Sequence, residues 1–101
     1  MTEFIIDISS TTDVMYIHVQ PPGTKVKSSD TSLTRGVVVD LDDAGNVVGI
    51  EFLAVTNQDL MGSVNKIIDK YVSPTYGAPS PLDAVMALRL RHLAQIGWVL
   101  K

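Results

Sequence analysis

With 101 residues, 46% of them hydrophobic and 19% charged, the chain can bury one hydrophobic core and is predicted to fold as a single domain over residues 1–101. The absence of cysteine excludes disulfides and thiolate metal sites, and no apolar run approaches the ~18 residues needed to cross a membrane. The first residues are acidic where a signal peptide is basic, so we expect a cytoplasmic protein that does not bind membranes.

Charge is distributed unevenly along the sequence, although the net charge is only −3. Residues 1–62 hold three basic side chains against nine acids, a net charge of −6, whereas residues 63–101 hold five against two, a net charge of +3. Because an acidic surface repels phosphates, nucleic-acid binding is disfavoured for the first part and remains open for the last third.

Two short β-strands are predicted in the first twenty residues. Residues 3–8 and 13–20 are rich in β-branched and aromatic side chains, and apolar residues alternate along both. The sequence Pro-Pro-Gly at residues 21–23 ends the second strand, because proline cannot donate to a strand ladder and glycine turns freely. The polar residues up to 32 predict a long loop.

A β-hairpin is predicted over residues 36–54, where the apolar runs 37–41 and 47–53 flank a polar turn that contains Gly45. The predicted core-face pairs are Val37 with Phe52, Val39 with Ile50, and Leu41 with Val48. A slip of one residue would bury Asp40 or Glu51, and burying an unpaired carboxylate costs roughly several kcal/mol. Four strands joined in order by turns predict an antiparallel meander over residues 3–55.

The apolar period then changes to that of two helices. Apolar residues recur at helical spacing from residue 60, which predicts a helix over residues 57–72 with Thr56 as its N-cap. Ser80 and Pro81 predict the start of a second helix over residues 81–96, with Gly97 just after its end. The predicted fold class is α+β: a four-stranded antiparallel β-meander followed by two C-terminal α-helices.

No residue pattern in the sequence points to catalysis or to a bound cofactor. Asp40, Asp42, Gly45 and Glu51 have the spacing of an EF-hand calcium loop, but strands flank them where that motif needs helices. Phosphate-binding loops, zinc-protease motifs and serine-hydrolase motifs are missing. An enzyme built on Asp40 and Glu51 ranks third, and we predict a non-enzymatic protein with no catalytic residue, cofactor or metal.

The second face of the predicted sheet is the main candidate for a working surface. The side chains expected there are Val14, Tyr16, Val38, Val47 and Leu53, beside His18, Asp40 and Glu51. This face is too apolar for open solvent and too polar for a dry core, a mixture that is found at protein interfaces. Either residues 80–101 cover it or a second subunit does, and the sequence leaves both alternatives open.

We therefore hypothesise a protein-interaction module that self-associates, for example as a homodimer, and binds another protein. The expected contact residues are Tyr16, Val38 and Leu53 on the sheet, and Arg89, Leu90, Arg91 and Trp98 on the last helix and the apolar segment after it. An apolar segment at a chain end should pack on something, which is why Trp98 is included.

The alternative is a nucleic-acid-binding regulator that uses the basic last third. Arg89 and Arg91 on the last helix could contact phosphates, and Lys66 and Lys70 form a second basic strip. The connection over residues 73–80 is too long and too rich in proline for a helix-turn-helix, so this hypothesis ranks second.

One sequence pattern resembles a known family. The matching residues are Asp13, Tyr16, Ile17, Asp40, Asp42, Gly45, Gly49, Ile50, Glu51 and Leu53. They resemble domain-of-unknown-function family 2283, a group of small bacterial and phage proteins, over about residues 3–56. The resemblance implies a small antiparallel sheet packed on a helix and no established activity. Some relatives look like partners of toxin-like proteins, which implies an antitoxin-like or phage–host regulatory role.

Overall fold

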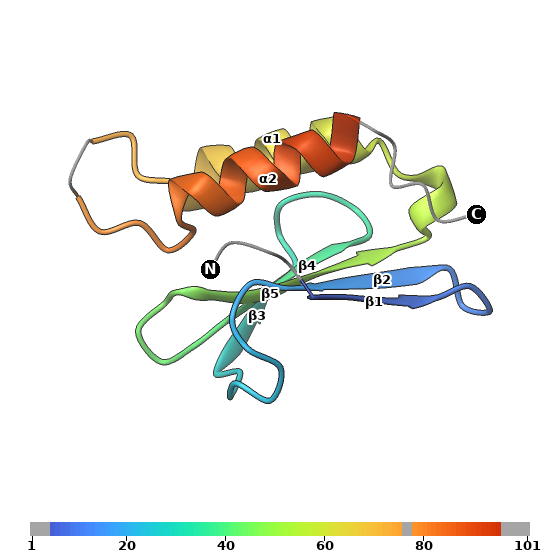
Figure 1. The fold of residues 1–101 in the computed structure, drawn as a ribbon, viewed down its shortest axis with the longest axis horizontal. Helices are drawn as coiled ribbons and strands as arrows, with labels where there is room; N and C mark the ends of the chain where they lie inside the picture. The colour runs from blue at the N-terminus through green and yellow to red at the C-terminus, as the bar shows by residue number, and fades with distance from the viewer. Residues whose placement is uncertain (1–4, 76–77, 96–101) are drawn as a thin grey trace.

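The computed structural model describes residues 5–75 and 78–95, which form a layer of helices on one antiparallel sheet (Figure 1). The strands are β1 (Ile5–Ser9), β2 (Val14–His18), β3 (Ser28–Asp30), β4 (Val37–Leu41) and β5 (Val47–Leu53). The helices are α1 (Leu60–Tyr71) and α2 (Ala84–Gln95), and a short 3-10 helix, Val55–Asn57, precedes α1. The predicted α+β class, with an antiparallel sheet and two C-terminal helices, is confirmed.

The sheet has five strands rather than the predicted four, in the order β1-β2-β5-β4-β3. After β2 the chain crosses to the far edge, forms β3, and returns through β4 to β5, which pairs with both β2 and β4. The predicted meander is therefore wrong, and the last four strands form a Greek key. The sequence pattern misses β3 because its Ser-Ser-Asp sequence has no apolar residue to reveal an alternation.

The hairpin of β4 and β5 keeps two of the three predicted core-face pairs, which are Val37 with Phe52 and Val39 with Ile50. The third pair is wrong, since Leu41 lies opposite Val47 instead of Val48. A bulge between Asp40 and Leu41 shifts the register by one residue. As a result Val47 and Val48 are both buried, and Val47 does not belong to the exposed second face as predicted.

α1 begins at Leu60, later than the predicted residue 57. Its N-cap is Asp59, whose Oδ1 accepts the backbone N–H of Gly62 at 3.1 Å. Thr56, the predicted N-cap, lies in the 3-10 helix, and its hydroxyl donates to Asp13 Oδ2 at 2.6 Å. This contact joins residues far apart in the sequence, so local capping rules could not reveal it.

α2 also begins later than predicted, because Asp83 rather than Ser80 provides the cap. Asp83 Oδ1 accepts the backbone N–H of Val85 at 2.8 Å. The Ser80 hydroxyl oxygen instead accepts the backbone N–H of Ser73 at 2.8 Å, which stabilises the connection between the helices. The predicted end of this helix near Gly97 lies outside the described residues.

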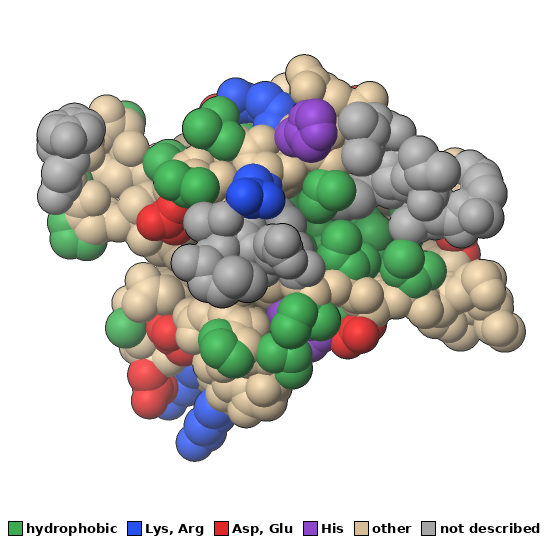
Figure 2. Space-filling view, viewed as in Figure 1, with side chains coloured by type: hydrophobic (Ala, Val, Ile, Leu, Met, Phe, Trp, Pro, Cys, Tyr) green, Lys and Arg blue, Asp and Glu red, His purple; other side chains and the backbone are tan. Residues whose placement is uncertain are grey.

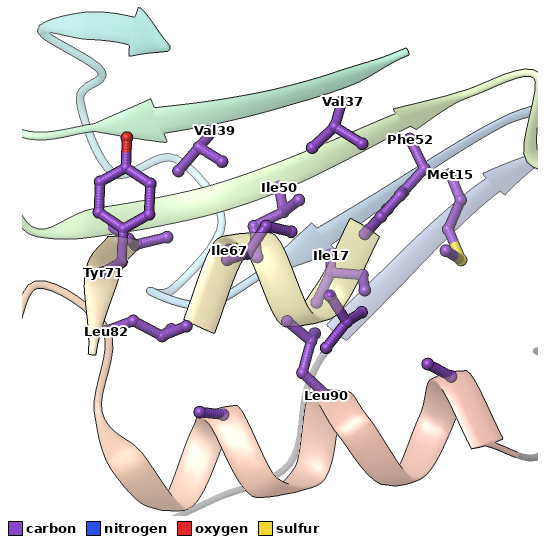
Figure 3. Packing of buried hydrophobic residues seen from close by; sticks show 14 of the residues in the cluster. Met15, Ile17, Val37, Val39, Ile50, Phe52, Ile67, Tyr71, Leu82 and Leu90 are labelled. Atoms are coloured by element: carbon purple, nitrogen blue, oxygen red, sulfur yellow. The ribbon is translucent and has the colours of Figure 1, made fainter. Parts of the chain in front are cut away.

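Both helices pack on the same face of the sheet (Figures 1 and 3). The buried floor consists of Met15, Ile17, Val37, Val39, Ile50 and Phe52, which are at most 2% exposed. Ile67 of α1, Leu90 of α2 and Leu82 just before α2 are fully buried in the same cluster. Leu90 was expected at a partner contact, and it lies in the protein's own core because α2 turns its apolar side inward.

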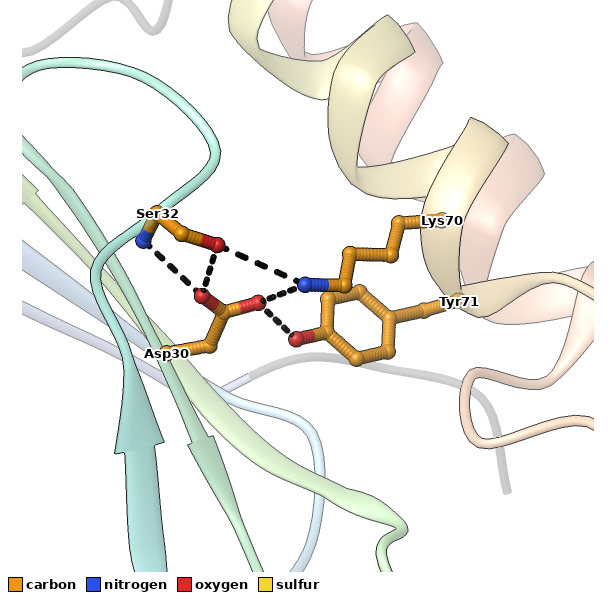
Figure 4. Close-up of polar contacts among 4 residues, drawn as sticks. All are labelled: Asp30, Ser32, Lys70 and Tyr71. Atoms are coloured by element: carbon orange, nitrogen blue, oxygen red, sulfur yellow. Dashed lines mark hydrogen bonds and ion pairs between the residues drawn. The ribbon is translucent and has the colours of Figure 1, made fainter.

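The Asp30 carboxylate at the end of β3 ties the sheet to α1 (Figure 4). It accepts hydrogen bonds from Lys70 Nζ at 2.6 Å and from the Tyr71 hydroxyl. Ser32 adds its backbone N–H at 2.8 Å and its hydroxyl at 2.6 Å. The Lys70 contact above all, and then the bonds from Ser32 and Tyr71, hold the pKa of Asp30 well below its usual range. An ionised Asp30 therefore fastens a strand that has little apolar surface of its own.

We predict that Asp30 makes the protein less stable in acid. The pKa of Asp30 is lower in the folded state than in the unfolded chain, where it is about 3.9. The contribution of Asp30 to the free energy of unfolding is therefore present above that pH and is lost as the pH falls toward the folded-state pKa. Asp30→Asn should lower the free energy of unfolding at neutral pH and flatten its decline in acid, as measured by urea denaturation across that range.

The matched control is Asp43→Asn. The Asp43 carboxylate is 83% exposed and lies 3.7 Å from Lys27, so we expect little change in the free energy of unfolding at neutral pH or in acid. Equal losses of stability in the two variants would contradict a specific role for Asp30.

Candidate interaction surface

The side of the sheet away from the helices is not covered by any helix of the described structure, and we call it the open face (Figure 1). Strand alternation and the observed register place these side chains on it: Ile5, Asp7 and Ser9 of β1; Val14, Tyr16 and His18 of β2; Ser29 of β3; Val38 and Asp40 of β4; Glu51 and Leu53 of β5. The alternative that the last helix covers this face is wrong for its described residues, because α2 packs beside α1 on the other side.

A tyrosine bridges three strands at the centre of the open face. The Tyr16 hydroxyl of β2 donates to Asp40 Oδ2 of β4 at 2.8 Å, and Ser29 of β3 donates to the other carboxylate oxygen at 2.6 Å. To reach Asp40, Tyr16 passes over Gly49 of β5, where an added Cβ would lie 2.1 Å from the tyrosine oxygen. Glycine at position 49 is therefore required by the ring that covers it.

A second polar contact joins β1 to β2. His18 Nε2 lies 2.6 Å from Asp7 Oδ2, and the histidine is 16% exposed while the aspartate is 71% exposed. The His18 ring meets the Tyr16 ring edge-on, with 4.7 Å between the ring centres. Tyr16, His18, Asp7 and Asp40 are thus each oriented by a neighbouring side chain.

Apolar and acidic side chains share the rest of the open face. Leu53 is 38% exposed and Ile5 is 51% exposed, and both are large apolar residues. Its strand residues include three carboxylates, on Asp7, Asp40 and Glu51, but no lysine or arginine. A hollow of about 360 Å³ adjoins this face, and its lining includes two predicted contact residues, Val38 and Leu53.

The predicted contact residues fall into separate places. Tyr16, Val38 and Leu53 come together on the open face. On α2, Arg89 is exposed and Arg91 is half-buried, and residues two apart on a helix point to different sides. Trp98 lies outside the described residues.

Sequence reasoning missed several residues of this surface. Asp7 and Ile5 join it through the pairing of β1 with β2, and only the register of that pair reveals that they flank His18. Ser29 belongs to the open face because β3 pairs with β4, and no apolar alternation in the sequence predicts β3. The available signal for Ile5 was the alternation of Ile6 and Ile8 with Asp7 and Ser9, which places Ile5 on the same face as Asp7.

The chemistry available on the open face is hydrogen bonding and apolar contact. Both oxygens of Asp40 already accept hydrogen bonds. Burial, with the bond to Asp40, raises the pKa of Tyr16 further above its usual value, so the hydroxyl stays protonated at neutral pH. Among residues 5–75 and 78–95, no group of three or more His, Cys, Asp or Glu side chains could hold a metal ion.

A family model described as a protein of unknown function, DUF2283, matches residues 5–55. The chain belongs to the DUF2283 family. No curated protein and no solved structure matches it significantly. The DUF2283 region contains all five strands and hence the whole open face, whereas α1 and α2 follow it in the chain.

The helices outside the DUF2283 region are short. Each has 12 residues, and no helix of the described structure is long and apolar enough to cross a membrane.

We predict that Gly49→Ala destabilises the DUF2283 region through Tyr16. The new methyl group would displace the ring and break its bond to Asp40, and the loss of a half-buried hydrogen bond should cost about 1–3 kcal/mol in urea denaturation.

The control is the same substitution in a Tyr16→Leu background, where no hydroxyl remains to be displaced. There Gly49→Ala should cost less, because the two residues act through one contact. Equal costs in the two backgrounds would show that Tyr16 is not the reason for the glycine.

Proposed function

We propose that this protein is a non-enzymatic protein-interaction module whose contact surface is the open face. The observation that supports this most is the combination, on a sheet face without a covering helix in the described structure, of exposed Leu53 and Ile5 with three carboxylates. Protein interfaces combine a few apolar anchor residues with polar and charged residues around them, and the open face offers both.

The rigidity of the open face supports the proposal. Tyr16 and Ser29 hold Asp40, and His18 holds Asp7, so these side chains have already lost much of their freedom before a partner arrives. Ordering side chains at an interface costs about 0.5–1.5 kcal/mol each, and a surface ordered in advance avoids that cost. The hollow beside Val38 and Leu53 offers room for one anchoring side chain of the partner.

The charge of the open face indicates the kind of partner. Asp7, Asp40 and Glu51 are acidic and no lysine or arginine lies among the strand residues of this face, whereas Arg35 lines the hollow at its edge. The favoured partner therefore presents basic side chains to the strands and an uncharged, apolar anchor to the hollow. Association should then become slower as salt is added. In a bacterial or phage-infected cytoplasm, such a partner would give the regulatory role, antitoxin-like or phage–host, that the family resemblance implies.

The test compares partners captured from the native cell by the wild-type protein and by surface variants. A Glu51→Lys, Leu53→Lys double variant adds two positive charges to the open face and should weaken capture of the partner roughly tenfold or more, since like charges across an interface cost several kcal/mol. Leu88→Lys is the matched control, because Leu88 is 64% exposed on α2, away from the open face.

A partner retained by wild type and Leu88→Lys but lost by the double variant supports the proposal. A partner lost only by Leu88→Lys, or bound equally by all three proteins, contradicts it. Circular dichroism of each variant establishes that the fold is intact.

Nucleic-acid binding remains the alternative hypothesis. It depends on Arg89 and Arg91, which point to different sides of α2, and on the strip of Lys66 and Lys70. Lys66 is exposed, but the ammonium group of Lys70 is engaged by Asp30. We therefore expect no retention on heparin at low salt, where phosphate-type contacts are strongest. Retention that an Arg89→Ala, Arg91→Ala double variant abolishes would favour the alternative.

A further inference from the structure

The two edges of the sheet differ in their protection against strand addition. β3, at one edge, has three polar residues, and its Asp30 is fastened to α1. Short, charged edge strands resist pairing with other chains. β1, at the other edge, has five residues, of which three are isoleucine. Within the described residues, its backbone hydrogen bonds go to β2 alone, so its outer side presents unpaired N–H and C=O groups.

Isoleucine side chains are exposed on both faces of β1. Ile5 lies on the open face and is 51% exposed, whereas Ile8 lies on the helix-covered face, opposite Met15, and is 49% exposed. A partner on the open face alone would leave Ile8 in water, but a strand added beside β1 contacts both faces at once. Figure 2, which has the same view as Figure 1, shows apolar side chains gathered where the helix layer meets the sheet. β1 and α2 lie on this side of the molecule.

We propose that β1 pairs antiparallel with β1 of a second copy of this chain and joins the two sheets into one. A two-fold axis perpendicular to the sheet keeps like faces together, so paired residues must both be odd-numbered or both be even-numbered. The register that pairs all five residues has its axis at Asp7. It sets Ile6 opposite Ile8 of the second copy, and symmetry repeats this pair. The inference gives a surface to the self-association hypothesised from the sequence, and it does not depend on the open-face partner.

The composition of β1 favours a second copy over an unrelated peptide. Each exposed Ile8 meets an Ile6 that is itself only partly buried, so the contact is apolar on both sides. The two Asp7 side chains face each other at the axis, and two free carboxylates in that position would repel each other. Each Asp7 carboxylate, however, lies 2.6 Å from His18 Nε2 of its own β2, and this contact turns the carboxylate away from the axis.

Cysteine cross-linking tests the register directly, since the described residues and the full sequence contain no cysteine. In Asp7→Cys the two introduced residues lie opposite each other, with Cα atoms about 4.5–5.5 Å apart, within reach of a disulfide. We expect a covalent dimer of the full chain under mild oxidation. Ser28→Cys, on the opposite edge strand, is the matched control and should form no covalent dimer, although its β1 edge still pairs. No cross-link at Asp7, or equal cross-linking of both variants, overturns the proposal.

A second measurement uses variants without cysteine. Ile8→Lys should raise the dimer dissociation constant in sedimentation equilibrium roughly tenfold or more, because each interface loses two isoleucine pairs. It should leave the affinity of one open face for a partner with a single binding segment unchanged, because Ile8 does not lie on that face. The Glu51→Lys, Leu53→Lys variant should dimerise like wild type. A wild-type protein that stays monomeric at high concentration, or an Ile8→Lys variant that dimerises equally well, overturns edge pairing and leaves open-face binding standing.

Discussion

Burial of one face of β5 is the constraint on which the rest of the structure depends. Ile50 and Phe52 are inaccessible to solvent beneath the helices, and strand alternation then sends Glu51 and Leu53 to the other side. Because β5 pairs with β2 and β4 along its two edges, the same division into an inner and an outer face is imposed on both neighbours. Both helices use the one apolar floor that results, so the opposite face keeps its exposed leucine and its carboxylates.

The sequence predicts those parts of the fold that local patterns determine. The β4–β5 hairpin follows from alternation, and the two helices follow from their apolar period, although both begin later than predicted. β3 could not be predicted, because Ser28–Asp30 has no apolar alternation and is held by its pairing with β4 and by the contact of Asp30 with Lys70 and Tyr71, about forty residues away. The bulge is equally hidden, since the extra residue, Val48 of β5, lies in an unbroken apolar run that gives no sign of it.

The candidate surface divides in the same way. Tyr16, Val38 and Leu53 are predictable because alternation alone assigns them to the face opposite the core. Leu90 is not, since an apolar helix stripe shows that a face will be covered but does not show by what, and here the cover is the protein's own sheet and α1. The bridge from Tyr16 over Gly49 to Asp40 requires the order β2-β5-β4, which the predicted meander did not contain.

Pairing at the β1 edge and binding at the open face are compatible, because they use different parts of one sheet. A two-fold axis perpendicular to the sheet keeps both helix layers on one side and both open faces on the other. Asp40 and Glu51 of two copies would then belong to one longer acidic surface. For a partner with two basic segments, binding of the first holds the second at a high effective concentration, so overall affinity rises without a new kind of contact. Self-association would thus strengthen partner binding rather than compete with it.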